Sequence, residues 1–327
     1  MATTVRGAME APSPPLQGTA NAERPDGKTA TTERQRPDGV ADTGGRDARA
    51  QRIALRDVVL EYRAPGQVPV RALDLVGFDV PDGQFVSILG PSGCGKSTIL
   101  KLVSGLLTPT SGDVRLDGEP IRGIPPSVGF MFQSDALLPW ATVLDNVALA
   151  LELRGLGTRE RRARARELTG LVGLGGFEDA YPSTLSGGMR KRVSLARVLA
   201  YDPAVYLMDE PFGALDAQTK VQLGAELLRL WGGVRKTVLF VTHDIEEEIA
   251  LSDRVLVMTR RPGQIKADFT IDLPRPRDFY EVRFTPAFQE LHCDIWKQLS
   301  AEVAPAHMPA PGEAAASISA PGSVAGR

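Results

Sequence analysis

A glycine-rich loop between two apolar segments constrains this chain more than any other feature. Residues 90–98 read GPSGCGKST and fit the pattern G-x-x-x-x-G-K-[S/T]. FVSILG before the loop has the length and composition of a buried strand, and KSTILKLVSGLL after it is apolar at helical spacing. A strand that turns into a helix in this way points backbone N–H groups and the positive helix end at one anion. The sequence therefore predicts a phosphate-binding loop and disfavours a chance glycine turn.

Two side chains of this loop are suited to a nucleotide. Lys96 is expected to reach the outer phosphates, and the Ser97 hydroxyl is expected to bind Mg²⁺. Cys94 is interpreted as a small residue that the loop accommodates. The predicted nucleotide site takes in the whole loop: Gly90, Pro91, Ser92, Gly93, Cys94, Gly95, Lys96, Ser97 and Thr98.

Nucleotide hydrolysis also needs carboxylates beside the phosphates, and VYLMDE at 205–210 supplies them. This short apolar run is predicted to be a buried strand with Asp209 and Glu210 at its carboxyl end. Asp209 is expected to hold the magnesium through its water shell, and Glu210 to polarise the attacking water. Adjacent acids also occur in solvated turns, so the phosphate loop is what favours the catalytic interpretation.

Strand-like and helix-like segments alternate along most of the chain, which indicates an α/β fold. FVSILG, AVYLMDE and TVLFVTHD have the pattern of a mostly parallel sheet that is covered on both faces. IALRDVVLEYR and VRALDLVGFDVPDG are expected to pair as an antiparallel layer. RVLVMTRRPGQIKADFTIDL is predicted to be a hairpin with its turn at Pro262-Gly263.

Composition excludes several classes of protein. The chain has 327 residues and a net charge of -2, which gives no basic footprint for nucleic acid. No apolar stretch approaches the roughly 20 residues of a membrane span. Two cysteines make no disulfide framework, and no secretory signal is recognised. We expect a cytosolic chain.

The two ends differ from the middle. Residues 1–50 contain APSPP and two copies of RPDG, and the tail over 304–327 is similarly poor in large apolar residues. Such segments bury too little surface to offset their ordering entropy. The predicted organisation is a disordered extension over 1–50, a folded domain over 51–303 that ends in a helix, and a disordered tail over 304–327.

The segment LSGGMRKRVSLARVL at 185–199 lies between the phosphate loop and the acidic strand. With it, residues from about 53 to 300 strongly resemble the ATP-binding subunits of ABC transporters, through several motifs in the expected order. The resemblance implies a P-loop NTPase fold of the ABC type. That fold has a mostly parallel core sheet, an antiparallel β subdomain and a helical subdomain that carries the signature. The resemblance also implies an ATPase that uses ATP and Mg²⁺.

The signature-like residues Ser186, Gly187 and Gly188 are expected to open a helix, which would make a second anion site. The resemblance implies that two subunits pair head to tail, so that each signature closes on the partner's nucleotide. A Ser-Gly-Gly helix cap without a nucleotide contact is the alternative.

The resemblance also assigns single residues. Gln133, at the end of VGFMFQ, matches the glutamine that senses magnesium and the attacking water. Asp216 in GALD matches the acid of a segment that crosses to the partner subunit, and His243 in VTHD matches the histidine that contacts the terminal phosphate. Tyr62 matches the aromatic residue that stacks on adenine; a buried core tyrosine is the alternative.

The chain departs from the family pattern after the signature. Met189 and Lys191 stand where glutamines are common, although methionine is frequent among importer subunits. Lys191 is expected to lie on the signature helix near the nucleotide or its neighbour, with little loss of activity.

Two stretches favour one branch of the family. FQSDALLPWATVLDNV at 132–147 and LPRPRD at 273–278 resemble the ATPases that serve nitrate, taurine and alkanesulfonate import. Such systems contain a permease and a periplasmic binding protein, so this chain would be peripheral at the cytoplasmic side of the inner membrane. A rigid basic loop is the alternative for LPRPRD.

The resemblance implies that the segment after Gln133 lines a groove that receives a short helix from the permease. Residues 137–140, Leu-Leu-Pro-Trp, are therefore a candidate permease contact, and apolar patches outside the core often mark such surfaces. The alternative is that Trp140 packs in the core beneath a helix that begins near Thr142. The arginine-rich stretch at 158–170 is interpreted as a solvated helix face.

Other classes of nucleotide-binding protein fit less well. ABC ATPases of DNA repair contain a long coiled coil and those acting on ribosomes contain two motif sets, and this sequence shows neither. A P-loop kinase or GTPase would leave LSGG and GALD unexplained, and the intact motif residues argue against a purely regulatory nucleotide binder. The sequence therefore favours an importer ATPase for a small anion. An importer for another small solute and a non-transport ABC-type ATPase are the alternatives.

Overall fold

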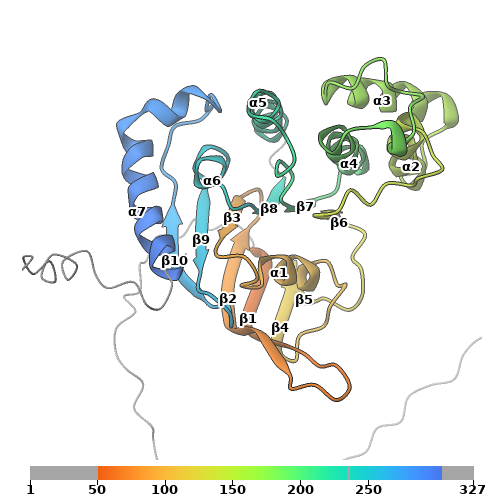
Figure 1. Ribbon diagram of the computed structural model, residues 1–327. Helices are drawn as coiled ribbons and strands as arrows, with labels where there is room; N and C mark the ends of the chain where they lie inside the picture. The colour runs from red at the N-terminus through yellow and green to blue at the C-terminus, as the bar shows by residue number, and fades with distance from the viewer. Residues whose placement is uncertain (1–50, 234–235, 304–327) are drawn as a thin grey trace, which may run out of the picture. The chain divides into compact units, whose positions relative to one another are not determined.

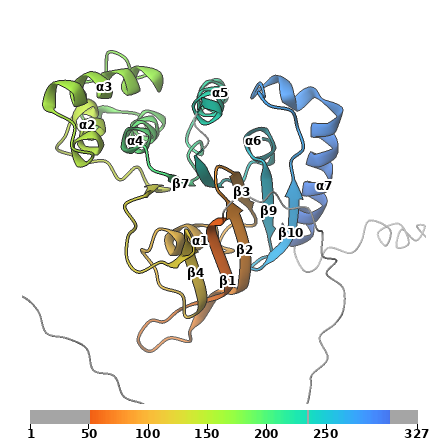
Figure 2. The same cartoon turned by 180° about the vertical axis from the view of Figure 1, so that it is seen from behind.

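The computed structural model describes residues 51–233 and 236–303, which form two sheets and the helices around them (Figures 1 and 2). The segments predicted to be disordered, 1–50 and 304–327, lie outside the described residues. The predicted domain boundaries therefore stay predictions.

The smaller sheet is antiparallel, with strand order β2-β1-β4-β5. Its strands are β1 (Gln51–Tyr62), β2 (Val70–Pro81), β4 (Ser111–Leu116) and β5 (Glu119–Pro120). β1 and β2 pair as the sequence predicts, with Ile53 opposite Val80 and Leu60 opposite Leu73. The register shifts near Asp57, whose φ is 47°, and this irregularity separates two buried triplets of β1.

The larger sheet is mostly parallel, as predicted. Its order is β10-β9-β3-β8-β7-β6, and β10 is antiparallel to β9. The strands are β3 (Phe85–Leu89), β6 (Val128–Met131), β7 (Val205–Asp209), β8 (Thr237–Val241), β9 (Arg254–Met258) and β10 (Ile265–Thr270). Parallel strands end at the same edge, so this topology brings the loops after β3, β7 and β8 together.

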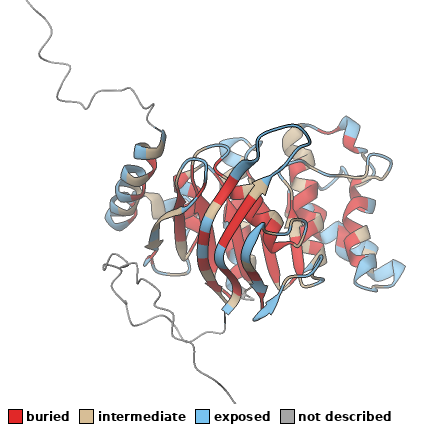
Figure 3. Ribbon diagram, turned by 90° about the horizontal axis from the view of Figure 1, so that it is seen from below, coloured by how far each residue is buried: buried red, intermediate tan, exposed pale blue. Residues whose placement is uncertain are grey.

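Both faces of this sheet are covered, which explains its continuously apolar strands. Ile88, Leu207 and Leu239 pack toward helix α1 (Lys96–Val103) and the antiparallel sheet. The alternate residues, such as Met208 and Phe240, pack toward the remaining helices. Figure 3 shows the buried residues concentrated along the strands.

Helices α2 (Val143–Leu153), α3 (Thr158–Leu171) and α4 (Gly187–Tyr201) pack against one another and form the predicted helical subdomain (Figure 1). Only Ala165, Leu168 and Thr169 of α3 are buried, which confirms that its arginines lie on a solvated face. The other elements are η1 (Pro182–Thr184), α5 (Ala217–Gly233), α6 (Ile245–Leu251), η2 (Glu281–Phe284) and α7 (Pro286–Val303). In the described ranges, no helix combines the length and the apolar character that crossing a membrane requires.

The LPRPRD segment fastens the region before α7 to the end of α6. Arg275 forms an ion pair of 2.9 Å with Asp253 and lies over the Trp231 ring, 4.1 Å from its centroid. Arg277 is buried and donates to the carbonyl oxygens of five residues, Ile249, Ala250, Ser252, Ile271 and Leu273. Burial lowers the pKa of Arg277 to about 10, so the guanidinium stays charged at neutral pH. The LPRPRD segment therefore has a structural role.

Candidate active site

The predicted phosphate loop connects the end of β3 to the start of α1. Gly90 is packed so tightly that a Cβ atom there would lie 2.9 Å from Cys94 Sγ and 3.0 Å from Met258 Cβ. Gly95 directly precedes α1 with a φ of 109°, a conformation that side chains disfavour. Neighbouring elements therefore fix the curled backbone that an anion site requires.

Lys96 and Cys94 are both buried in this loop. The Lys96 ammonium donates to the carbonyl oxygens of Gly90 (2.7 Å) and Pro91 (3.1 Å). Burial raises the pKa of the Cys94 thiol, which argues against a reactive thiolate at neutral pH. Cys94 thus has the packing role that the sequence suggests.

A pocket of about 240 Å³ opens at the loop. The sequence-predicted residues in its wall come from four separate regions of the chain: Tyr62, Ser92, Gly93, Gly95, Lys96, Ser97, Thr98, Gln133 and Glu210. Ala72 and Arg261 also line it and were not predicted. Neither belongs to a motif, and they reach the pocket only because the β2 and β9–β10 backbones pack on the loop.

Tyr62 stands at the rim of this pocket. Its side chain is 45% exposed, so the alternative of a buried core tyrosine is wrong. The phenol oxygen lies 3.1 Å from Thr98 Oγ1, which orients the ring beside the start of α1. The ring is available to contact a planar group.

The two acids occupy the end of β7 as predicted. Asp209 is only 4% exposed, and burial raises the pKa of its carboxyl, although a hydrogen bond with Ser97 acts in the opposite direction. Its Oδ1 has no hydrogen-bond partner among the described residues. Glu210 follows with a φ of 48°, and its backbone N–H donates to Val241 O at 2.8 Å. This bond to β8 holds the strained residue in place.

Gln133, Glu210 and His243 meet at the carboxyl edge of the sheet. Gln133 Nε2 lies 3.3 Å from Glu210 Oε2, and His243 Nδ1 lies 3.6 Å from Glu210 Oε1. The three residues follow β6, β7 and β8, so the strand order explains why they converge. A carboxylate between an amide and an imidazole can orient water and accept its proton.

The signature residues open α4 as predicted. Ser186 is its N-cap, and the Ser186 hydroxyl accepts a hydrogen bond from Met189 N at 3.2 Å. A Cβ atom on Gly188 would lie 3.1 Å from Ala214 O, so the signature packs against the GALD segment. Asp216 accepts from Thr219 N at 2.9 Å, and these bonds lower the pKa of the Asp216 carboxyl. None of Ser186, Gly187, Gly188, Asp216 and His243 lines the pocket at the phosphate loop.

Lys191 lies on α4, as expected, but its surroundings were not anticipated. Its side chain is buried, and the ammonium donates to the carbonyl oxygens of Phe132 (3.1 Å) and Gln133 (2.7 Å). Burial lowers the pKa of Lys191, whereas the charges of Asp135, Asp209 and Glu210 act in the opposite direction. Lys191 therefore holds the backbone that carries Gln133.

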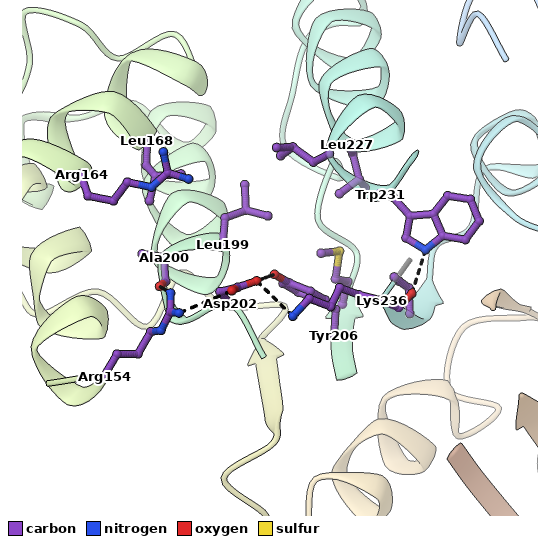
Figure 4. Close-up of a pocket in the computed structure, with 13 residues that line it drawn as sticks. Arg154, Arg164, Leu168, Leu199, Ala200, Asp202, Tyr206, Leu227, Trp231 and Lys236 are labelled. Carbon is purple, nitrogen blue, oxygen red and sulfur yellow. Dashed lines mark hydrogen bonds and ion pairs between the residues drawn. The ribbon is translucent and has the colours of Figure 1, made fainter. Parts of the chain in front are cut away.

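A second pocket, of about 290 Å³, lies away from these residues (Figure 4). At its edge, Asp202, the C-cap of α4, forms ion pairs with Arg154 (3.5 Å) and Lys236 (3.3 Å). The Tyr206 hydroxyl is also 3.5 Å from Asp202 Oδ1. These contacts join the helical subdomain to the large sheet. We therefore interpret the residues around this pocket as structural.

Comparisons with known proteins agree with this geometry. A family model described as ABC transporter matches residues 73–213. The taurine import ATP-binding protein TauB of Rhizobium johnstonii is 48% identical over 230 residues, which cover 69% of this chain and 88% of the relative. The protein of the same name from Burkholderia pseudomallei (strain 1710b) is 44% identical over 235 residues, which cover 71% of this chain and 90% of the relative.

A solved structure resembles the described part of the chain. It is the dimeric structure of an ATP-binding cassette in a post-hydrolysis state, bound to ADP and Pi. Its TM-score is 0.62 at 33% sequence identity, and the match covers 68% of this chain and 100% of that chain. This chain therefore belongs to the ABC transporter family of ATP-binding proteins, and it is a P-loop ATPase that binds and hydrolyses ATP.

Proposed function

We propose that this chain is the ATP-hydrolysing subunit of an importer for a small anion, such as taurine, nitrate or a sulfonate. The supporting observation is its 44–48% identity to proteins named for taurine import. The subunit acts as a homodimer beneath permease subunits, at the cytoplasmic side of the inner membrane. A periplasmic binding protein would deliver the cargo, so it contacts this chain only indirectly.

Uptake by whole cells tests this proposal. Deleting the gene is expected to abolish uptake of one labelled anion from a panel of taurine, an alkanesulfonate and nitrate. A plasmid copy restores uptake, and a Lys96→Ala copy does not. Loss of an uncharged solute instead would favour the importer for a different small solute. Unchanged uptake of every solute in a broad panel would favour a non-transport ABC-type ATPase.

The proposed chemistry assigns a role to the sequence-predicted residues in and beside the pocket. The phosphate loop, residues 90–98, binds the phosphates through its backbone N–H groups and Lys96. Tyr62 stacks on adenine, which its exposed ring permits. Glu210 polarises the attacking water, and Gln133 and His243 place that water and the terminal phosphate. The 3.3 Å and 3.6 Å contacts among these three residues support the assignment.

Magnesium fits the same site. The Oδ1 atom of Asp209 is buried without a partner among the described residues, and a hydrogen bond with Ser97 acts on the same carboxyl group. Mg²⁺ takes most of its ligands from phosphates and water, so it needs few protein side chains. Ser97, Gln133 and, through water, Asp209 would hold the ion. When bound, the ion neutralises charge on the phosphates.

Asp209→Asn is expected to separate stability from activity. Asp209 has a raised pKa, so its charged form costs folding free energy above that pKa. The variant should therefore unfold at a higher temperature than the parent at pH 7–8 without nucleotide, and the gap should shrink as the pH falls and the parent takes up its proton. Hydrolysis with Mg²⁺ should fall at least about a hundredfold, because the variant removes the carboxylate that holds the ion.

Calorimetry and phosphate release measure these two effects, and Asp179→Asn, an exposed aspartate, is the matched control. A lower unfolding temperature for Asp209→Asn would contradict the cost assigned to this carboxylate. Full activity with Mg²⁺ would contradict its place in the metal site.

The homodimer proposal rests on the position of the signature. The wall of the nucleotide pocket in this chain contains no signature residue, so the start of α4 does not complete that pocket. Because Gly188 packs on the GALD backbone, the signature and Asp216 belong to one surface. That surface is suited to a nucleotide held by a second copy of the chain, and the similar cassette structure is a dimer.

Residues 137–140, the docking segment, are proposed to receive the permease. Trp140 is 74% exposed, so the alternative that it lies in the core is wrong. Asn146 is fully buried. Its Oδ1 accepts a hydrogen bond from Leu138 N (2.9 Å), and its Nδ2 donates to Leu138 O (3.2 Å) and to Ala141 O (3.0 Å). These bonds fix the backbone of the segment and leave the indole in solvent, which favours a binding surface.

Trp140→Ala is expected to abolish uptake and leave the isolated subunit intact. An indole this exposed contributes little to folding, so the free energy of unfolding should change by no more than about 0.5 kcal/mol. ATPase activity of the isolated subunit should stay within about twofold of the parent. Leu153→Ala, at the other end of α2 and 72% exposed, is the control in both assays. Normal uptake by Trp140→Ala would reject this segment as the permease contact.

A further inference from the structure

The turn between β9 and β10, residues 259–264, packs directly against the phosphate loop. Gly263 N donates to Ala72 O at 2.9 Å, and Asp74 N donates to Gly263 O at 3.0 Å. A Cβ atom on Gly263 would lie 2.0 Å from Cys94 O, so only glycine permits this approach. The turn is therefore fixed relative to the site where the phosphates bind.

Arg261 occupies this turn and lines the nucleotide pocket. Lys96 and Arg261 are the cationic residues of the pocket wall, and Lys96 is engaged with carbonyl oxygens of its own loop. Within the described part of the chain, no hydrogen bond or ion pair engages the exposed Arg261 side chain. A guanidinium presents several donors in a planar fork that matches phosphate oxygens.

The residues around Arg261 are engaged in holding the turn. Gln264 N donates to Thr259 Oγ1 at 3.0 Å, and Gln264 Nε2 donates to Asp74 Oδ2 at 2.9 Å. Arg260 N donates to Glu302 Oε2 at 3.0 Å, and Lys266 Nζ lies 2.8 Å from Glu302 Oε1. The bond with Lys266 is the largest of the contacts that lower the pKa of the Glu302 carboxyl.

Glu302 belongs to α7, which runs alongside β9 and β10 (Figure 1). The Glu302 carboxylate therefore contacts the chain on both sides of Arg261, at Arg260 before it and at Lys266 after it. This arrangement links the end of the C-terminal helix to the wall of the nucleotide pocket.

We propose that Arg261 binds the phosphate chain of ATP and that Glu302 positions it. Arg261 is a nucleotide-binding residue outside the phosphate loop, and Glu302 acts through the turn without touching the nucleotide. The proposal rests on ATP binding, which the family membership establishes. It is independent of the importer role and of the cargo.

Nucleotide affinity of the full-length chain tests the first part. Arg261→Ala is expected to raise the Kd for ATP about tenfold, the loss of one charged contact. Arg261→Lys should retain part of the ATP affinity that Arg261→Ala loses, because lysine keeps the positive charge. The Kd for adenosine, measured as a competitor of a fluorescent ATP analogue, should stay within about twofold because adenosine has no phosphate.

The control is Arg159→Ala, an exposed arginine on α3 that should leave both constants unchanged. An unchanged Kd for ATP in Arg261→Ala would overturn the proposal. Equal weakening of ATP and adenosine would overturn the contact with phosphate. Thermal unfolding checks that each variant is folded.

A double-mutant cycle tests the role of Glu302. Glu302→Ala is expected to raise the Kd for ATP about threefold in the parent and to have no further effect in Arg261→Ala, because it acts only through that arginine. Asp294→Ala, on the same helix and paired with Lys297, is the control. Additive effects of Arg261→Ala and Glu302→Ala would overturn the positioning role, since a general loss of stability would lower affinity in both backgrounds.

Discussion

Replacing Glu210 with glutamine is expected to lower kcat for ATP hydrolysis at least about a hundredfold while the Kd for ATP stays within about twofold. Glutamine preserves the length of the side chain and its contact with Gln133, but it cannot accept a proton from water. The contacts of 3.3 Å to Gln133 and 3.6 Å to His243 place the carboxylate where the sheet edge meets the pocket. Phosphate release and nucleotide displacement give the two constants.

The same variant should accumulate as an ATP-bound dimer, because hydrolysis no longer separates the subunits. Size-exclusion chromatography with ATP and Mg²⁺ measures this species. Glu119→Gln makes the same chemical change at an exposed strand position and should behave as the parent does. A Glu210→Gln variant that hydrolyses ATP at more than about a tenth of the parent rate would remove Glu210 as the group that activates water.

Local patterns predicted the parts of the site that lie within one stretch of chain. Each of these parts is a continuous segment of the chain: the loop at 90–98, the strand that carries Asp209, and the helix that Ser186 caps. Continuous apolar runs also indicated which strands are covered on both faces, and the burial of every residue of β3, β7 and β8 confirms this.

The sequence could not predict which charged side chains are buried or which exposed residues reach the pocket. Lys191 looks like any helix lysine in the sequence, but it is buried, and carbonyl oxygens 58 and 59 positions away accept hydrogen bonds from its ammonium group. Arg261 lines the pocket because Gly263 in the β9–β10 turn lies against Cys94 in the phosphate loop, and no local pattern in the sequence predicts this contact. The sequence left open whether Trp140 is in the core, and its 74% exposure in the structure shows that it is not.

Helix α4 connects three features that the sequence shows separately. Its first residues are the signature, and its buried Lys191 holds the backbone at Gln133. Arg197 Nη1 donates to Ala136 O at 2.8 Å, next to the docking segment, and Arg190 Nε lies 2.8 Å from Asp135 Oδ2. A shift of the signature helix would therefore act on the backbone at Gln133 and Ala136, next to the docking segment. This is a physical route by which a nucleotide on one chain could act on a membrane partner.

The consequence for the signature is a second large effect. Ser186→Glu is expected to lower hydrolysis by the dimer at least about a hundredfold, because a carboxylate at the start of α4 would repel the phosphates of the partner's nucleotide. The Kd for ATP of the isolated chain should stay within about twofold, since its own pocket contains no signature residue. Glutamate can still cap the helix weakly, so a circular-dichroism spectrum like that of the parent serves as the folding control.

Mixing two inactive variants gives the sharpest test of the head-to-tail dimer. Lys96→Ala disables the phosphate loop of one chain, and Ser186→Glu disables the signature of the other. In a head-to-tail pair of these chains, one site carries both defects and the other site is intact. Random mixing should therefore restore up to about a quarter of the parent activity, because half of the dimers are mixed and each has one working site. If each chain completed its own site, both variants would stay inactive after mixing, and if Ser186→Glu alone kept full activity, the signature would have no role across the interface.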